Sequence, residues 1–342
     1  MSYRYIGNKT RLLPVLMDSF KEAVNDGATI ADIMCGTASV SEALRQNEYR
    51  VVASDMMTFA AHHARVRLLL SEPPEFSDTG LNGYSNVLDY LNHLKPVEGV
   101  FFREYSPDGT PKNGHEPRKY FSGYNAGMID AITATLNQWQ VANAISHLEN
   151  ALLRHDLVLA ANRIANIAGT YGHHRSKWGK SAETPLEMRP TRILNRHRTD
   201  HIVHQGSAET VAPLVKADLC YIDPPYMKRQ YAANYHIIET IARGDAPEAV
   251  GVSGLRPWRD QYSDFCSKVK IRDAFRAIFN GAECDQFMIS YSEDGLLSEE
   301  QLLELFSEVG TVTLKRIPFS RFRSNAGGQG GTVIEYLFHI KR

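Results

Sequence analysis

The sequence predicts an α/β fold in which a mostly parallel sheet ends in an antiparallel hairpin and carries a largely helical insertion. Three observations lead to this prediction. Short apolar segments alternate with helical patterns at the start of the chain, and the same alternation resumes after residue 200. Between these parts, a stretch rich in glycine and proline is followed by two long helical patterns. Alternating strands and helices favour parallel strands joined by right-handed crossovers.

The elements expected before the insertion form two strand–helix units. They are a helix at 10–25, a strand at 28–34, a helix at 39–46, a strand at 50–53 and a helix at 59–70. The insertion is expected at 71–198, mostly as loop up to residue 127 and then as helices at 128–138 and 143–167. The sequence therefore predicts a catalytic domain made of residues 1–70 and 199–342 around this insertion.

The elements expected after the insertion return to the α/β pattern and end in the hairpin. They are strands at 201–204, 217–222 and 286–291, helices at 208–216, 235–243, 271–279 and 298–309, and a hairpin of 311–317 with 332–340.

Composition sets limits on the class of protein. With 342 residues, 43% hydrophobic and 23% charged, the chain can bury a large core and one further lobe. No apolar run approaches the roughly eighteen residues of a membrane-spanning helix, and the first residues lack the apolar segment of a secretory signal. The four cysteines stand far apart, so we expect neither disulfides nor a metal site, and a cytoplasmic location.

The tetrapeptide Asp223-Pro224-Pro225-Tyr226 follows an expected buried strand, and ligand sites of open α/β sheets lie at the carboxyl ends of strands. The amine of a nucleobase is a poor nucleophile because its lone pair is delocalised into the ring. Acceptors aimed at its N–H bonds, here the Asp223 carboxylate and the Pro224 carbonyl, favour the reactive geometry. The two prolines restrict the backbone, and Tyr226 can stack on an extruded base. The other interpretation is a plain turn.

A second candidate site is the turn Asp32-Ile33-Met34-Cys35-Gly36-Thr37-Ala38-Ser39, which follows the first expected strand. Small residues let the backbone approach a ligand, and the next helix presents its N-terminus there. Asp55 ends the second expected strand roughly 20 residues later, the spacing at which dinucleotide folds place a carboxylate on ribose hydroxyls. The turn lacks G-x-G-x-x-G, which argues against a nicotinamide dehydrogenase.

In order, YIGNK, DIMCGTAS, Asp55, DPPY and Ser290-Tyr291-Ser292 resemble the D12 class of DNA adenine-N6 methyltransferases, which open with a (Y/W)xGxK motif. The motif order is kept across nearly the whole chain, and residues 118–178 resemble the family's central region. The resemblance implies a Rossmann-like S-adenosylmethionine-dependent methyltransferase sheet, with 71–198 as target-recognition region. It implies a site-specific DNA methyltransferase that moves the methyl group from S-adenosylmethionine to N6 of a flipped-out adenine by direct in-line displacement.

The resemblance also implies roles for residues. Lys9 and Tyr5 would line the cofactor site, Asp55 would hold the ribose, and Asp223 would touch both the cofactor and the target amine. The expected catalytic residues are Asp223, Pro224, Pro225 and Tyr226, and the expected cofactor-binding residues are Tyr5, Gly7, Asn8, Lys9, Asp32, Met34, Cys35, Gly36, Thr37, Asp55, Met56, Ser207 and Asp223. The alternative interpretation of YIGNK is a helix start capped by Asn8.

Two positions of the glycine turn depart from the family pattern. Met34 stands where the family usually has Phe, and Ala38 where it usually has a second Gly. A flexible Met can pack beside a cofactor and Ala is small, so we expect binding to be retained.

The formal net charge of −1 means that a nucleic-acid partner would need a local basic surface. Basic residues outnumber acidic ones in 171–204, and the glycine-rich loop 320–331 adds further hydrogen-bond donors. The alternative for the basic run is an ordinary solvated face, and Tyr171 and Trp178 fit either packing or contact with bases. The expected DNA contacts are Arg175, Lys177, Lys180, Arg192, Arg321, Arg323 and Asn325.

Double-stranded DNA is the expected partner, with no membrane, and a cognate restriction endonuclease is a candidate partner. N6-adenine methylation of RNA and N4-cytosine methylation of DNA stay open, because those amines pose the same chemical problem. A catalytically silent nucleic-acid-binding subunit is the alternative of another class, against which the intact Asp223, Tyr226 and Lys9 argue. Cys220 lies inside an expected strand and does not fit the exposed thiolate of a cytosine-C5 enzyme. The recognition sequence and the oligomeric state do not follow from the sequence.

Overall fold

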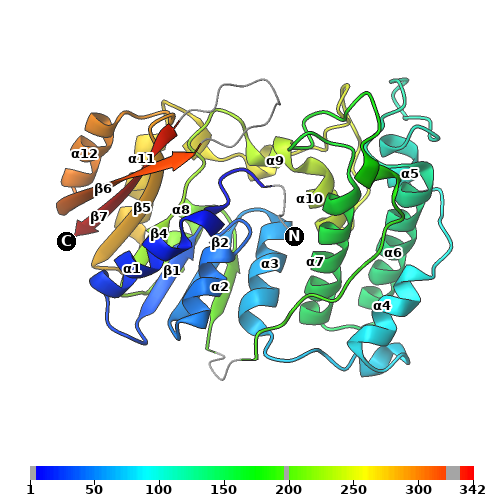
Figure 1. The fold of residues 1–342 in the computed structure, drawn as a ribbon, viewed down its shortest axis with the longest axis horizontal. Coiled ribbons are helices and arrows are strands. Elements are labelled where there is room, and N and C mark those ends of the chain that lie inside the picture. Colours follow the sequence, from blue (N-terminus) through cyan, green and yellow to red (C-terminus); the bar gives the residue numbers. More distant parts are fainter. Residues whose placement is uncertain (1–4, 196–199, 321–331) are drawn as a thin grey trace. The chain divides into compact units, whose positions relative to one another are not determined.

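The computed structural model of the chain describes residues 5–195, 200–320 and 332–342. The chain divides into two compact units (Figure 1). The helical unit consists of Met1–Ile6, Arg65–Asn195 and Ala232–Asp260, and the sheet unit consists of Gly7–Ala64, Arg196–Tyr231 and Gln261–Arg342. The helical unit therefore contains most of the expected insertion and also a segment that follows the DPPY motif.

The described residues of the sheet unit form one seven-stranded sheet with the order β3-β2-β1-β4-β5-β7-β6. Strands β1 to β5 are parallel, whereas β7 is antiparallel to both β5 and β6. This topology confirms the predicted mostly parallel sheet with a C-terminal antiparallel hairpin. The strands are β1 Thr29–Ile33, β2 Arg50–Asp55, β3 Ile202–Gln205, β4 Leu219–Ile222, β5 Gln286–Ser292, β6 Thr311–Ser320 and β7 Thr332–Lys341.

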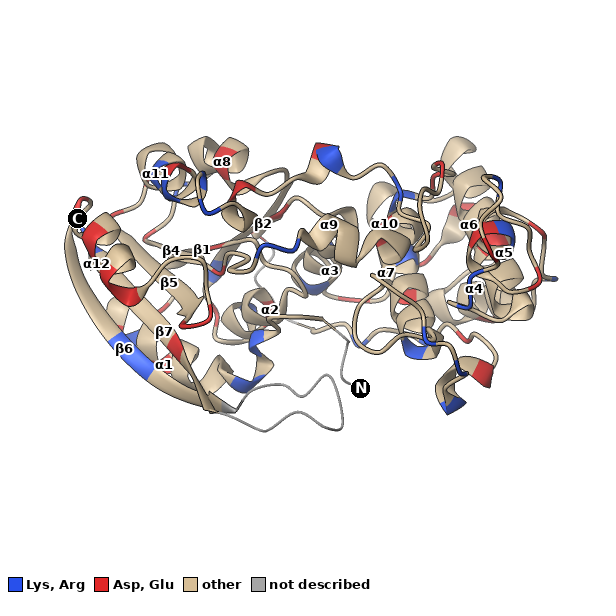
Figure 2. Ribbon diagram, turned by 90° about the horizontal axis from the view of Figure 1, so that it is seen from above, with Lys and Arg blue, Asp and Glu red and all other residues tan. Residues whose placement is uncertain are grey.

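Helices cover both faces of this sheet. Seen from above, α1 and α2 lie on one face and α8 and α11 on the other (Figure 2). The helix expected at 10–25 is two elements, because a short 3₁₀ turn precedes α1, and Pro14 in the first turn of α1 needs no N–H partner there. The elements are η1 Lys9–Arg11, α1 Leu13–Ala23, α2 Ser39–Gln46, α8 Ala208–Val211, η4 Ala212–Leu214, η6 Asp264–Cys266, α11 Ile271–Gly281 and α12 Glu299–Ser307.

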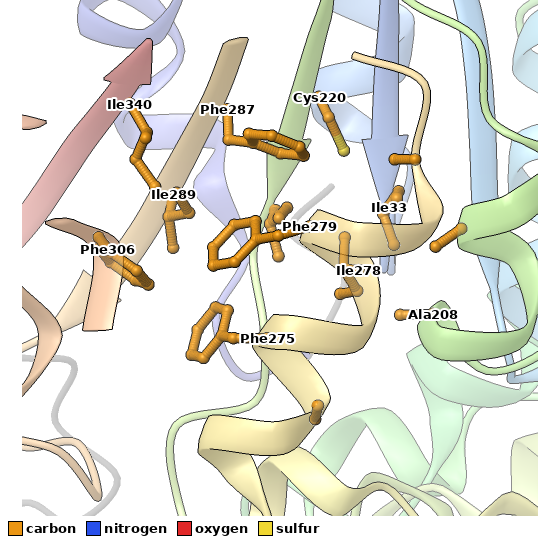
Figure 3. Close-up of a cluster of buried hydrophobic side chains, with 14 of the residues drawn as sticks. Ile33, Ala208, Cys220, Phe275, Ile278, Phe279, Phe287, Ile289, Phe306 and Ile340 are labelled. Carbon is orange, nitrogen blue, oxygen red and sulfur yellow. The ribbon is translucent and has the colours of Figure 1, made fainter. Parts of the chain in front are cut away.

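An aromatic core lies between the sheet and helices α11 and α12 (Figure 3). Phe279 of α11 packs edge-on against Phe287 of β5, with ring centroids 4.9 Å apart, and Phe306 of α12 packs in the same way against Phe275 at 5.2 Å. Burial of each such ring contributes about 1.5–3 kcal/mol. Met34 and Tyr226, which follow β1 and β4, pack against this cluster. The core therefore supports the loops that carry the candidate site.

The helical unit contains two helices that the sequence analysis placed in loop. Residues 71–127 were expected to be mostly irregular, but α4 and α5 lie there. The buried residues of α4 are Tyr84, Val87, Leu88 and Leu91, at the i, i+3, i+4, i+7 spacing of one helix face. The glycines and prolines around them obscured this helical pattern. The helices of this unit are α4 Tyr84–Asn92, α5 Val100–Tyr105, α6 Gly123–Val141, α7 His147–Ile164 and α10 His236–Arg243, with the short turns η2 Ser77–Thr79 and η3 Lys180–Glu183.

Three further elements run across the unit limits: α3 Thr58–Leu69, α9 Tyr231–Asn234 and η5 Arg259–Gln261. Among the described residues, none of the helices combines the length and the apolar character needed to cross a bilayer.

A buried carboxylate on α7 anchors the segment that follows η3. Asp156 accepts hydrogen bonds from the hydroxyl of Tyr84 and, at 2.6 Å, from the hydroxyl of Thr191. The backbone N–H of Thr191 in turn donates to the Tyr84 hydroxyl at 3.0 Å. Burial raises the pKa of Asp156 to about 7, although the two hydroxyl donors act in the opposite direction. The network ties this segment to both α4 and α7.

We expect Asp156→Asn to flatten the pH dependence of stability between about pH 4 and pH 7. In this window the folded chain keeps a proton on Asp156 that the unfolded chain has lost, so the free energy of unfolding falls as pH rises. An asparagine cannot titrate and removes this contribution. Melting temperatures measured across the window for the wild type and the variant test this, with Asp78→Asn at an exposed carboxylate as control. Parallel curves for wild type and Asp156→Asn would contradict the assignment.

Candidate active site

The candidate site lies where the strand order reverses. β1 and β4 are parallel neighbours, with Asp32 opposite Tyr221 and Ile33 opposite Ile222, while β2 lies on the far side of β1 and β5 on the far side of β4. The loops that follow β1 and β4 therefore begin side by side. Open α/β sheets bind ligands at such a point, outside the carboxyl ends of the strands.

The turn after β1 has an unusual backbone. Met34, Gly36 and Ala38 have positive φ angles of 66°, 52° and 56°. An L-residue in this left-handed region costs about 1–2 kcal/mol. At Ala38, where the family pattern has glycine, the fully buried methyl group returns about 0.8 kcal/mol. The turn therefore tolerates alanine at this position at little net cost.

Two carboxylates flank this turn. The Asp55 carboxylate accepts hydrogen bonds from the backbone N–H of Gly36 at 2.9 Å and of Met57 at 2.8 Å. Asp32 is buried and accepts a 2.5 Å hydrogen bond from the hydroxyl of Ser41. Burial raises the pKa of Asp32 to about 7; Ser41 counteracts this shift, and the negative charges of Asp223 and Asp55 add to it. The turn is thus bordered by hydrogen-bond acceptors.

Lys9 forms an ion pair with Asp223, the first residue of the DPPY motif. The Lys9 ammonium lies 2.9 Å from Oδ1 of Asp223 and 3.8 Å from Oε2 of Glu335, and the Lys9 side chain is 5% exposed. Burial alone would lower the pKa of Lys9, but the charges of Asp223 and Glu335 outweigh it and raise this pKa. Burial raises the pKa of Asp223, while Lys9 opposes the shift. Lys9 therefore favours the ionised form of the carboxylate.

Glu335 on β7 is a site residue that the sequence analysis missed. It is buried, lies opposite Ser292 of β5, and its Oε2 atom has no hydrogen-bond partner within the described structure. Burial raises the pKa of Glu335, and Lys9 counteracts this shift. A carboxylate between Ile334 and Tyr336 in a buried strand is a signal that was available, because buried charges are rare unless they are paired.

Tyr226 is held by the chain that follows β5. Its ring packs edge-on against Tyr291, with centroids 6.0 Å apart, and its carbonyl accepts a hydrogen bond from Leu296 N–H at 3.1 Å. The Lys9 ammonium lies 5.8 Å from the Tyr226 ring centroid. Burial raises the pKa of Tyr226 to about 12, with Lys9 acting against the shift, so the phenol stays protonated at neutral pH. Tyr226 is thus an aromatic surface and not a base.

The rest of the DPPY motif and its surroundings are ordered by packing. Pro224 is buried and Pro225 is half-buried. Ser290 and Ser292 are buried at the end of β5, and the Tyr221 hydroxyl lies 2.7 Å from Oγ of Ser290. Ser290 and Ser292 therefore belong to the interior beside the DPPY motif.

Other expected cofactor residues have local structural roles. Asn8 accepts from Thr10 N–H at 2.9 Å and caps η1, as its alternative interpretation predicted. Ser207 caps α8 through a hydrogen bond from Thr210 N–H at 3.3 Å. Gly7 has a φ of 78°, which favours glycine. Three more expected residues lie at the ends of β1 and β2: Cys35 and Thr37, both buried, and Met56, whose carbonyl accepts a hydrogen bond from the Gln261 side chain.

The structure brings Lys9 and Asp223 together, whereas Tyr5 belongs to the helical unit. There its ring stacks on Tyr235, with centroids 4.8 Å apart and planes 22° apart. The expected role of Tyr5 in the cofactor site therefore stays a prediction.

The expected DNA contacts fall into two groups. Arg175, Lys177, Lys180 and Arg192 are exposed on the helical unit. The predicted contacts Arg321, Arg323 and Asn325 lie outside the described residues. Tyr171 is fully buried, which supports the packing interpretation, and Trp178 is half-buried. The chain directly after DPPY exposes Met227, Lys228 and Arg229, a basic segment that the sequence analysis did not single out.

A family model and two related proteins of known class were compared with this chain, and all three are DNA or type II methyltransferases. A family model described as D12 class N6 adenine-specific DNA methyltransferase matches residues 5–305. Type II methyltransferase M.FokI of Planomicrobium okeanokoites is 33% identical over 99% of this chain, which spans 52% of that protein. Type II methyltransferase M.NlaIII of Neisseria lactamica is 28% identical over 99% of both chains.

Similarity to solved structures is lower. The precorrin 8w decarboxylase of Methanobacterium thermoautotrophicum gives a TM-score of 0.35 with 9% identity, over 99% of this chain and 97% of that chain. At this score the likeness adds nothing to the sheet topology. The chain spans about half the length of M.FokI and of the modification methylase StsI of Streptococcus sanguinis. Because the family model covers most of its length, the chain belongs to the D12 class of N6 adenine-specific DNA methyltransferases.

Proposed function

We propose that this chain transfers a methyl group from S-adenosylmethionine to the N6 amine of adenine in double-stranded DNA. One observation carries the proposal: Asp223 directly follows β4 at the point where strand order reverses, and it is paired with Lys9. A nucleobase amine and a methyl donor would meet at that edge of the sheet.

The residues at this edge fit the proposed cofactor. S-adenosylmethionine carries a positive sulfonium, an ammonium group and ribose hydroxyls. A carboxylate can attract the two positive groups and accept hydrogen bonds from the hydroxyls, and Asp32, Asp55 and Asp223 lie at this edge. Asp55 is fixed by the backbone of the turn and would hold the ribose hydroxyls, while Met34, Gly36 and the rest of the turn would lie against the cofactor. Lys9 and Asp32 would complete its surroundings. When bound, the cofactor supplies a methyl group activated by the positive sulfur.

The chain's own residues would prepare the amine. We infer that Asp223 and the Pro224 carbonyl accept hydrogen bonds from the N6 amine, which becomes positive as it is methylated. The Tyr226 ring would stack on the adenine taken out of the duplex. Asp223 and the Pro224 carbonyl would hold the amine in line with the methyl group for a direct displacement, with no covalent bond to the chain, and the extra proton of the amine would pass to water. Alignment of these groups supplies much of the rate.

The product identifies the substrate. The chain is expressed in a host that lacks N6-methyladenine, and the nucleosides of its DNA and RNA are separated and weighed by mass spectrometry. N6-methyladenine in DNA at one sequence, mapped by methylation-sensitive sequencing, is the expected result. N4-methylcytosine, methylated RNA alone or no methylated product would overturn the proposal. The same host without the expressed chain is the negative control.

The names of the relatives, which are type II methyltransferases, support a proposal for the biological setting. We propose that the chain acts in the cytoplasm and protects DNA from a cognate restriction endonuclease that reads the same sequence. The helical unit would supply target recognition. DNA methylated by this chain should resist an endonuclease encoded beside its gene.

We expect replacement of Arg175, Lys177 and Lys180 by Gln to weaken DNA binding and reduce its salt dependence. These side chains are exposed, and no ion pair joins them to a carboxylate within the described residues. Three lost phosphate contacts would lower the slope of log K against log salt by up to about 2.7. Titrations of a labelled duplex at several salt concentrations measure this.

The control for this experiment replaces Arg272, Arg276 and Arg316, each of which is paired with a carboxylate on the sheet unit. This triple change should leave the slope near its wild-type value. If the changes at Arg175, Lys177 and Lys180 leave the slope of log K against log salt unaltered, these residues form an ordinary solvated face and do not contact DNA.

A further inference from the structure

An exposed apolar turn stands out in the helical unit. Residues Gly251–Gly254, named here the Val252 turn, are closed by two 2.8 Å backbone hydrogen bonds between Val250 and Leu255. Val252 at its tip is 69% exposed and Val250 is 50% exposed. Gly251 and Gly254 have φ angles of 70° and 67°, which shape the turn. Single exposed valines are common in proteins, so exposure alone indicates no function.

A buried arginine fixes the first half of the Val252 turn. Arg118 is 1% exposed and donates from Nη2 to the carbonyl of Gly251 at 2.8 Å and from Nε to the carbonyl of Val252 at 2.9 Å. Its remaining nitrogen donates to the carbonyl and to the carboxylate of Glu104, at 2.9 Å and 3.1 Å. A buried, charge-assisted set of bonds of this kind is strong and directional.

Two buried tyrosines fix the second half. The Tyr120 hydroxyl lies within hydrogen-bond distance of the Ser253 carbonyl at 3.2 Å, and the Tyr105 hydroxyl donates to the Gly254 carbonyl at 2.8 Å. Both rings are fully buried. Three carbonyls of the turn are thus bound by Arg118 and Tyr105, while the Ser253 carbonyl shares the single Tyr120 hydroxyl proton with the nearer Tyr171 carbonyl. Within the turn, the large side chain that faces solvent is Val252. These contacts hold the backbone of the turn in place.

The same contacts join the Val252 turn to the basic segment 172–180. The Ser253 hydroxyl donates to the Gly172 carbonyl at 2.6 Å, and the Tyr120 hydroxyl also contacts the Tyr171 carbonyl at 2.9 Å. Exposed Arg175 and Lys177 follow within a few residues. The Val252 turn is therefore hydrogen-bonded to the segment that carries these cations. An apolar tip on one segment and cationic side chains on the segment bound to it suit a surface that places apolar groups against base edges or base steps and holds the neighbouring phosphates.

We propose that the Val252 turn is a rigid contact for duplex DNA, in which Val252 supplies an apolar contact with the bases while the adjoining basic segment binds the backbone. The proposal rests on the proposed function, because it names how the helical unit holds the substrate. Immobilisation by Arg118, Tyr105 and Tyr120 removes most of the entropic cost of ordering the tip on binding.

Val252→Ser tests the proposal, with Val141→Ser as matched control. Val141 is 86% exposed at the end of α6 in the same unit. A fluorescent duplex with the mapped recognition sequence is titrated at several salt concentrations. We expect Val252→Ser to bind about tenfold more weakly, since an apolar contact of roughly one to two methylene groups is lost. The salt slope should stay at the wild-type value, because no charge changes.

A second variant tests the role of rigidity. Tyr105→Phe removes the hydroxyl that holds Gly254 and leaves the tip unchanged. We expect a smaller loss of affinity, again without a change in salt slope, and unchanged binding by this variant would overturn the role of the clamp. Circular dichroism melting of all variants confirms that they are folded.

The outcomes separate the two proposals. If the wild type itself neither binds the duplex nor methylates it, the proposed function fails. If the wild type binds and methylates DNA while Val252→Ser matches Val141→Ser in affinity, the Val252 turn is not a DNA contact. A loss of affinity that comes with a reduced salt slope would show that the change acts on the phosphate contacts, and would also overturn the apolar contact.

Discussion

Asp223→Asn should lower the rate of methyl transfer by about 10²–10³-fold, while the variant still binds S-adenosylmethionine and DNA. The asparagine has the size of aspartate but no charge, so it cannot stabilise the positive charge that grows on the amine, and losses of this size follow removal of one such group. Transfer of a radiolabelled methyl group to the mapped duplex in a single turnover, at saturating cofactor and DNA, measures the effect.

Asp285→Asn is the control for this change, because Asp285 is an exposed carboxylate just before β5 of the same sheet. It should leave the rate unaltered. Calorimetric binding of the cofactor to Asp223→Asn shows whether the fold has survived the loss of the partner of Lys9. Turnover close to that of the wild type in the Asp223 variant would remove the proposed mechanism.

The sequence predicted the sheet well because each strand has its own local signal. The segments that became β1, β2, β4 and β5 are short and apolar and are bounded by turns, and the C-terminal hairpin has two long strands. The helices α4 and α5 were missed because the glycines and prolines around them outweighed a clear helical spacing. A local pattern predicts an element reliably only where the flanking residues favour the same secondary structure.

The extent of the helical unit depends on contacts between distant segments. Ala232–Asp260 follows DPPY in sequence, but belongs to the unit that contains the insertion. The buried Arg118, which binds the carbonyls of Gly251 and Val252, is one contact that joins them. A lysine or arginine in a sequence shows no sign of whether its charge will be buried against backbone carbonyls, so this grouping could not be predicted.

In the candidate site, too, local motifs could be predicted from the sequence, whereas contacts between distant segments could not. DPPY and the glycine turn are each contiguous in sequence, and each follows a strand as predicted. That these two strands, β4 and β1, are neighbours is known only from the structure. Glu335 reaches Lys9 only because β7 pairs with β5 in the register that sets Glu335 opposite Ser292. Register follows from the packing of whole strands, and a shift of one residue would turn Glu335 to the other face. The local pattern marks Glu335 as a carboxylate in a buried strand, but it does not show that Lys9 is its partner.

Lys9→Met should reduce the rate at neutral pH by about tenfold to a hundredfold and move the acid limb of the pH–rate profile upward by about one pH unit or more. Burial raises the pKa of Asp223, and the Lys9 charge holds this pKa down. Without that charge the pKa rises further, so a larger fraction of Asp223 is protonated and unable to accept both amine hydrogen bonds. Rates measured from about pH 6 to pH 9 test the shift.

The stability of the same variant should change with pH in the opposite direction. With the Asp223 pKa raised further above its unfolded value of 3.8, the folded chain holds a proton that the unfolded chain has lost, so stability falls as pH rises through the folded pKa. Activity should therefore increase with pH while the melting temperature decreases. Glu335→Gln is the contrast, because it leaves the 2.9 Å contact of Lys9 with Asp223 in place and should not raise the acid limb. An unshifted profile in Lys9→Met would mean that ionisation of Asp223 does not limit the reaction.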